Sequence, residues 1–300
     1  GALARYRNVE KRCEQRGIAE RGALAPLFVL ISARPEFRPP WGMRSNHSLI
    51  ALAPLDRDEV RHMVAELAAR RGLSKQVVEA VTERSGGVPL FVEEVTRLLL
   101  EGGAHGGNQA IPPTLQQSLT ARLDRLGPAR EVVQIGAVIG RNFSYQLIRL
   151  VTAMEDEPLQ AALERLAQAD VLLVRGLPPD ADYRFRHALI QDAAYGNLLK
   201  SRRQELHRRV AEVLRDVIAA VAAEPELLAH HFTQAGMPEA AIEWWGKAGQ
   251  RSLERSALVE AVEHLTRALD QIAALPSTAA LRQQQIKFQV PVATALGVMK

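Results

Sequence analysis

Apolar residues along this 300-residue chain recur mainly every three to four positions, the spacing of helices that bury one side. A clear example starts at Asp56, a residue type that caps helix N-termini, and is closed by Gly72. The apolar residues between them share one side of the expected helix: Val60, Met63, Val64 and Leu67. The chain from Leu189 onward shows the same helical pattern. The pattern therefore predicts a mainly α-helical protein.

Two stretches depart from the helical spacing. The run APLFVLIS (residues 25–32) is continuously apolar, as in a strand that is covered on both faces. The segment DVLLVRGLPPDADYRFRHA (170–188) predicts two strands joined by a turn at Gly176–Asp182. Four short helices are expected before this hairpin: Thr114–Leu126, Pro128–Ile139, Ser144–Val151 and Pro158–Ala169. Three helices followed by a hairpin are typical of a winged helix.

Glycine, proline and repeated spacing indicate how the chain is divided. EGGAHGGNQAIPP (101–113), with four glycines and two prolines, is the clearest linker. Two later segments, 239–250 and 260–271, both begin with Glu-Ala and end with Gln. This similarity favours stacked helical pairs that resemble tetratricopeptide repeats.

Composition narrows the class of protein. Hydrophobic residues make up 47% and charged residues 24% of the chain, as in ordinary globular proteins. No apolar run approaches the roughly 18 residues that a membrane span needs, so we expect no membrane partner. The single cysteine, Cys13, excludes an internal disulfide and suits the cytoplasm. A net charge of +4 is too small to indicate a nucleic-acid partner by itself.

The usual catalytic and metal-binding motifs are missing from the sequence. There is no phosphate-binding GxxxxGK[ST] loop, no strand that ends in paired magnesium-binding carboxylates, and no GxSxG or HExxH motif. His230 and His231 are neighbours on a predicted helix and point to different sides, so a shared metal is not expected. We therefore expect no catalytic residue and no metal site in this chain.

Three places nevertheless have the chemistry of a binding site. Arg34 follows the apolar run, and there its guanidinium could bind a phosphate or could only pair with Glu36. Gly87 and Pro89 could open a helix whose free N–H groups face a ligand, or could form only a tight turn between helices. His187, after the second predicted strand, could donate to a phosphate oxygen or pack at a strand–helix corner.

The order of these features resembles a known family. The phrases that carry the resemblance are SARPEFRPPW, GGVPLFVEEVTRLLLEGG, IPPTLQQSLTARLDRL, FRHALIQDAAYGNLL and LAHHFTQAG, and the similarity extends over about Ala23–Met299. The chain looks like the C-terminal part of a STAND-type signalling ATPase. It is most similar to the ATPase–tetratricopeptide region of bacterial class III adenylate/guanylate cyclases.

The resemblance implies roles for the candidate residues. Arg34 would sense the terminal phosphate, Gly87-Val88-Pro89 would close over the adenine side, and His187 would touch the β-phosphate of bound ADP. The family's Met-His-Asp motif is Arg186-His187-Ala188 here. ATP or ADP with Mg²⁺ would be the cofactor of the parent protein, whose phosphate loop, Mg²⁺ carboxylates and any cyclase domain should precede Ala23. Residues 1–22 do not resemble the segment expected there.

The implied organisation has four parts. They are a C-terminal remnant of a parallel-sheet P-loop NTPase core (1–50), a helical lid (51–108), a winged-helix domain with a β-hairpin (109–199) and a helical TPR-like region (200–300). In this interpretation the nucleotide state is coupled to a protein partner or effector that binds the TPR-like helices. We expect this chain alone to show negligible ATP hydrolysis and, at best, weak nucleotide binding.

Two other functions stay open at this point. The segment KSRRQELHRR (200–209) has five Lys or Arg residues against one Glu, which is compatible with a DNA-binding winged-helix regulator. The chain could also be a scaffold whose repeats bind a peptide.

Overall fold

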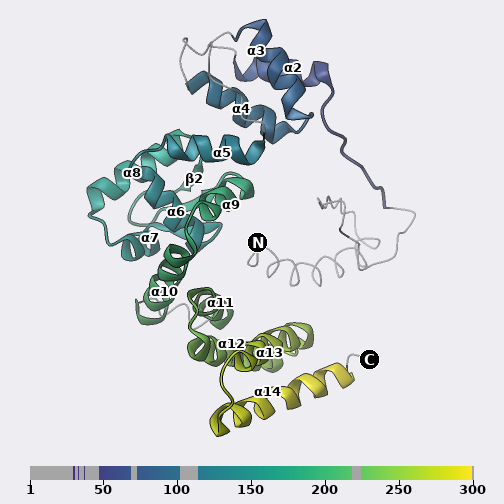
Figure 1. Ribbon diagram of the computed structural model, residues 1–300, viewed down its shortest axis with the longest axis vertical. Coiled ribbons are helices and arrows are strands. Elements are labelled where there is room, and N and C mark those ends of the chain that lie inside the picture. Colours follow the sequence, from purple (N-terminus) through teal and green to yellow (C-terminus); the bar gives the residue numbers. More distant parts are fainter. Residues whose placement is uncertain are drawn as a thin grey trace.

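The computed structural model describes Leu30, Ala33, Phe37 and residues 47–68, 73–101, 114–217 and 224–298. In these residues the chain forms thirteen helices and one three-stranded sheet, so the prediction of a mainly α protein is confirmed. Figure 1 shows the helices following one another along an elongated molecule, with α2–α4 at one end and α12–α14 at the other. Most of the expected apolar strand, residues 25–32, lies outside the described residues. Leu30 belongs to no strand and is 77% exposed, so the burial expected of that run is not observed at this residue.

The first group of helices forms a small core of its own. It consists of α2 (Arg57–Leu67), α3 (Lys75–Ser85) and α4 (Pro89–Glu101). Asp56 caps α2 as predicted, because its carboxylate accepts from two backbone N–H groups while Glu59 accepts from the Asp56 N–H at 2.9 Å. The apolar sides of the three helices meet in one cluster: Val60, Val64, Val81, Phe91, Val92, Val95 and Leu99.

The second group contains the sheet. Its elements are α5 (Leu115–Asp124), α6 (Ala129–Ile139), β1 (Asn142–Ser144), α7 (Tyr145–Thr152), α8 (Asp156–Gln168), β2 (Leu172–Arg175), β3 (Asp182–Phe185) and α9 (Ala188–Gly196). The strands lie in the order β1-β3-β2 and both pairs are antiparallel. The hairpin expected at 170–188 is therefore present, and β1 adds a strand that the sequence did not predict.

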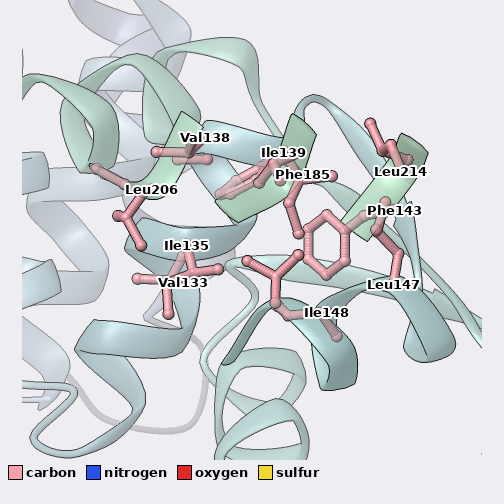
Figure 2. Close-up of a cluster of buried hydrophobic side chains, with 14 of the residues drawn as sticks. Val133, Ile135, Val138, Ile139, Phe143, Leu147, Ile148, Phe185, Leu206 and Leu214 are labelled. Carbon is pink, nitrogen blue, oxygen red and sulfur yellow. The ribbon is translucent and has the colours of Figure 1, made fainter. Parts of the chain in front are cut away.

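Aromatic rings fill the space between the sheet and its helices. The ring of Phe143 stacks on Tyr183 at a centroid distance of 5.7 Å and meets the edge of Phe185 at 6.1 Å. Figure 2 shows Phe143 and Phe185 beside Ile148 of α7. A Cβ on Gly136 of α6 would lie 2.8 Å from the Phe143 ring, so the absence of a side chain there lets this ring enter the core.

The third group is a series of long helices. They are α10 (Lys200–Val217), α11 (Pro225–Ala235), α12 (Pro238–Glu254), α13 (Leu258–Ala273) and α14 (Ala279–Val298). Each packs on the next, and Figure 1 shows α11–α14 stacked at the end of the molecule. Trp245 is buried in this stack, and its indole N–H donates to Thr233 Oγ1 at 2.9 Å. One cluster of buried apolar residues runs without a break from Leu119 to Phe288, so the second and third groups share a core.

No helix in the described part of the chain is both long enough and apolar enough to cross a membrane.

Candidate functional site

Helix α4 brings two of the three candidate places together. Gly87 and Pro89 form the corner between α3 and α4, and Pro89 is the first residue of α4. His187 lies directly before α9, and its Nε2 is 3.8 Å from Oε2 of Glu93. Because Glu93 is four residues after Pro89, the two places are separated by about 6 Å along the axis of α4. Arg34, the third candidate, lies outside the described residues.

The α3–α4 corner is held against the segment that precedes α2. Gly86 and Gly87 have φ angles of +57° and +72°, in the left-handed region that glycine adopts most readily. The carbonyl of Gly87 accepts from the N–H of Leu55 at 2.8 Å, and a Cβ on Gly87 would lie 2.2 Å from the Leu55 oxygen. A tight turn with a close backbone contact thus accounts for the glycine at position 87.

An ionic network fastens α4 to the hairpin. The guanidinium of Arg97 binds Asp170, which lies between α8 and β2, and also binds Glu93 one helical turn away at 3.0 Å. Arg186, at the junction of β3 and α9, donates to the other oxygen of Asp170 at 2.8 Å. Asp170 is therefore shared by two arginines from different elements, and it links α4, the α8–β2 turn and the residue next to His187.

The network keeps its members charged. Partial burial by itself would raise the pKa of Asp170, but the hydrogen bond and charge of Arg97, together with the charges of Arg186 and Arg122, lower it below the ordinary 3.8. Burial likewise opposes the charged form of Arg97, yet Asp170 and Glu93 outweigh it and raise the pKa of Arg97 above its ordinary value. At neutral pH the contact is thus between full charges.

A buried ion pair lies deeper in the same interface. Arg122 of α5 and Glu94 of α4 bind each other with side chains that are only 3% and 2% exposed. Arg122 also donates to the carbonyl of Ala169 at the end of α8, which would otherwise lack a helical partner. This one guanidinium therefore joins three helices.

His187 has an unsatisfied nitrogen in this setting. Its side chain is 33% exposed, but the Nε2 atom is buried and has no hydrogen-bond partner among the described residues. Glu93 at 3.8 Å is beyond hydrogen-bonding distance. A buried imidazole nitrogen without a partner is uncommon in proteins, and an acceptor oxygen placed beside it would satisfy its N–H form.

The sequence alone pointed to Pro89 and His187 at this interface, but not to the ionic residues that lie between them. Glu93 and Arg97 have the (i, i+4) spacing of a helical ion pair, and this spacing could have marked the polar side of α4. Asp170 and Arg122 carry no comparable local signal, because their partners are 73 and 28 residues away in the sequence.

Part of the positive charge of the basic segment 200–209 is engaged in contacts within the chain. Arg202 binds Glu205 at 2.8 Å and Glu131 at 3.1 Å, and Arg203 donates to the carbonyls of Leu198 and Gly196. Helix α8, which precedes the hairpin, has three carboxylates and one arginine. A groove-reading surface would need the opposite charge, so these contacts weigh against the DNA-binding alternative.

Other potential sites are limited in the described residues. No group of three or more His, Cys, Asp or Glu side chains there is arranged to hold a metal ion. Two hollows, of about 180 and 330 Å³, lie among helices α12–α14, and neither is lined by a residue of the α4–hairpin interface.

Comparison with known proteins gives a similarity to a much longer protein. It is 32% identical over 256 residues to an uncharacterized protein of Rhizobium meliloti (strain 1021). The match includes 82% of this chain but only 25% of the relative, so the chain spans about a quarter of that protein's length. No protein-family model matches the chain.

Proposed function

We propose that this chain is the C-terminal regulatory region of a nucleotide-switched signal-transduction ATPase of the STAND type, associated with an adenylate or guanylate cyclase. In this proposal α2–α4 are the lid, α5–α9 the winged-helix domain, and α10–α14 TPR-like helices that receive a protein partner or effector. The observation that carries it is the α4–hairpin interface. Helix α4, which begins at Pro89, is joined two turns later through Arg97 and Asp170 to Arg186, the residue before His187.

The element order supports the winged-helix assignment. Helix α6 is followed by a strand, two helices and a two-stranded hairpin, and the third strand lies between the other two in the sheet. Consecutive long helices that each pack on the next support the assignment of TPR-like pairs in α11–α14.

The residues present fit a phosphate ligand in part. The partnerless Nε2 of His187 could donate to a phosphate oxygen, and the nearby Arg97 and Arg186 provide positive charge. Glu93 lies beside the same imidazole and would repel that phosphate unless Arg97 remained bound to it. ADP with Mg²⁺ bound at this interface would contribute charge and hydrogen-bond-accepting oxygens. No residue described here would catalyse its hydrolysis.

The mechanism we propose is a two-state switch. The ion pairs of Arg97, Asp170 and Arg186 stabilise the closed arrangement of lid and winged helix, in which His187 faces α4. An effector that binds the TPR-like helices can shift the equilibrium only if it binds the open arrangement more tightly. The shared core between α5–α9 and α10–α14 is the physical route by which binding on the repeats would reach the winged helix.

Two experiments test the proposal. First, the coding sequence upstream of Gly1 should contain a phosphate loop and Mg²⁺-binding carboxylates, and an unrelated domain there would refute the ATPase assignment. Second, calorimetry on the 300-residue chain should show no tight, Mg²⁺-dependent ATP binding. In the longer protein, His187→Ala should weaken ADP binding, whereas His62→Ala, on an exposed face of α2, should not.

A scaffold function is the second candidate, because the outer side of α14 is apolar and exposed. Ile286, Val290 and Val298 are at least 60% exposed, and the 330 Å³ hollow beside them is lined mostly by apolar residues. If α14 binds a partner helix, Val290→Glu should abolish the complex in a pull-down from the native host, and Ala280→Glu, at the start of α14, should not.

A further inference from the structure

A cluster of three histidines lies at the joint between α10 and α11. His207 of α10 and His231 of α11 are buried, and their Nδ1 atoms are 2.8 Å apart in a hydrogen bond. The ring of His230 stands 5.9 Å from that of His207 and 5.5 Å from that of His231, between centroids. On the other side of His207, the hydroxyl of Tyr195 from α9 lies 3.0 Å from Nε2. The cluster therefore ties three helices together through imidazole nitrogens.

The hydrogen bond between the central pair excludes a positive charge on both rings at once. An Nδ1···Nδ1 bond needs one nitrogen that donates and one that accepts, so at most one of the two rings can be fully protonated. Whichever tautomer is present, Nε2 of His231 is buried without a partner, so a charge on that ring would lack a hydrogen-bonded counterpart.

The surroundings of the cluster do not compensate a positive charge. Arg203 of α10 lies over the Tyr195 ring at 4.8 Å, and the charge of Arg267 from α13 also acts on His230. In the described residues no carboxylate forms an ion pair with His207, His230 or His231, although His62 and His187 each lie beside one. The positive charges of Arg203 and Arg267 add to burial in lowering the pKa of His207 and of His230.

We propose that this histidine cluster is a pH-sensitive joint: mild acid protonates it, separates α10 from α11, and so frees the α11–α14 stack from the winged-helix unit. The location gives the joint its effect. Helix α10 packs against α6 and α7 on one side and against α11 on the other, so it is the element that connects the two parts.

The direction and size of the effect follow from protonation. Burial lowers the pKa of His207 to about 3 and that of His230 to about 4, and it lowers that of His231 well below the ordinary 6.5. Protons therefore bind the open joint and not the closed one, and the closed form loses stability as pH falls below about 6.5. Between pH 6 and pH 5 each imidazole raises the opening equilibrium constant about eightfold, so three raise it by several hundredfold.

Hydrogen exchange on the whole 300-residue chain tests the joint. After correction for intrinsic rates, the amides of α11 should open several hundredfold more often at pH 5 than at pH 6, while those of α6 stay unchanged. The double variant His207→Phe/His231→Phe should lower this ratio to about tenfold, because only His230 remains. His62→Gln, an exposed histidine of α2, should leave the ratio as in the wild type.

Imidazole NMR on the wild-type chain provides a measurement that needs no substitution. The resonances of His207 and His231 should change to the protonated form together with the opening of α11. Three results would overturn the proposal: unchanged exchange of α11 at pH 5, an equal increase in α6 and α11, or imidazoles that protonate while α11 stays closed.

Discussion

Replacing Arg122 with methionine tests whether the buried ion pair holds α4 in place. The substitution keeps most of the apolar stem but leaves the Glu94 carboxylate, which is 2% exposed, without its partner. It also removes the donor to the Ala169 carbonyl. Breaking one side of a buried pair costs about 3–5 kcal/mol, because the remaining charge is both desolvated and uncompensated. We therefore expect Arg122→Met to destabilise the α4–α5 interface by about this amount.

The position of the pair determines the assay. The α2–α4 core and the larger core are joined through few apolar contacts, so the loss should appear in α2–α4 first. Hydrogen exchange followed by mass spectrometry should show the amides of α4 opening about a hundredfold or more faster, since 1.4 kcal/mol corresponds to about tenfold. Amides of α12 and α13 should keep their wild-type rates and serve as the internal reference.

Two further variants separate the buried charge from other effects of Arg122→Met. Arg61→Met removes a partly exposed arginine that binds Asp58 and Glu79, and it should cost less than about 1 kcal/mol. The double variant Arg122→Met/Glu94→Leu removes both buried charges and should recover most of the loss. The reasoning is wrong if Arg122→Met costs no more than Arg61→Met, or if the double variant is as unstable as Arg122→Met alone.

Three other substitutions have defined outcomes. Gly87→Ala should lower the melting temperature of the α2–α4 unit well below that of the Gly86→Ala variant. Both glycines have a positive φ, but only a Cβ at position 87 would lie 2.2 Å from a backbone oxygen. Equal melting temperatures of the two variants would contradict this. Asp170→Asn should increase the hydrogen exchange of α4 at neutral pH. Because the pKa of Asp170 is lowered in the folded chain, its contribution to stability is fully present above about pH 3.8 and is lost as the pH falls through its folded pKa. Exchange measured from pH 5 to pH 2 should show this loss in the wild type and not in the variant. Gly249→Ala would place a Cβ 2.4 Å from Cδ2 of Leu265 and should cost about 1–3 kcal/mol in urea unfolding, and a neutral result would show that α12 and α13 separate easily.

Local signals in the sequence predicted the elements whose causes are local. The N-cap at Asp56 and the hairpin at 170–188 were both identified, because a capping side chain and two apolar strands around a turn are short-range features. Strand β1 was missed because it has three residues, Asn142–Ser144, and pairs with β3 about forty positions later. Its strand conformation is imposed by that pairing and by the packing of Phe143.

The candidate site was predictable in the same partial way. Gly87, Pro89 and His187 were predicted as binding residues from residue type and order, and that role stays a prediction; the structure places them on or beside the first two turns of α4. The groups that fasten these places together, such as Asp170, could not be found because their partners are distant in sequence. Whether Arg34 joins them is a prediction that the described residues leave untested.

The two sides of α4 make contacts of different physical kinds, and this difference bears on how a lid could move. One side packs into the apolar core of α2 and α3 through Phe91, Val92 and Val95, and such burial is strong at any orientation that excludes water. The other side meets α5 through Glu94, and it meets the hairpin segment through Arg97 and Glu93. Ion pairs depend on geometry and on competing charge, so a phosphate or an acidic partner can exchange with them while the apolar core stays intact. If α2–α4 are the proposed lid, their shared apolar core would move as one body.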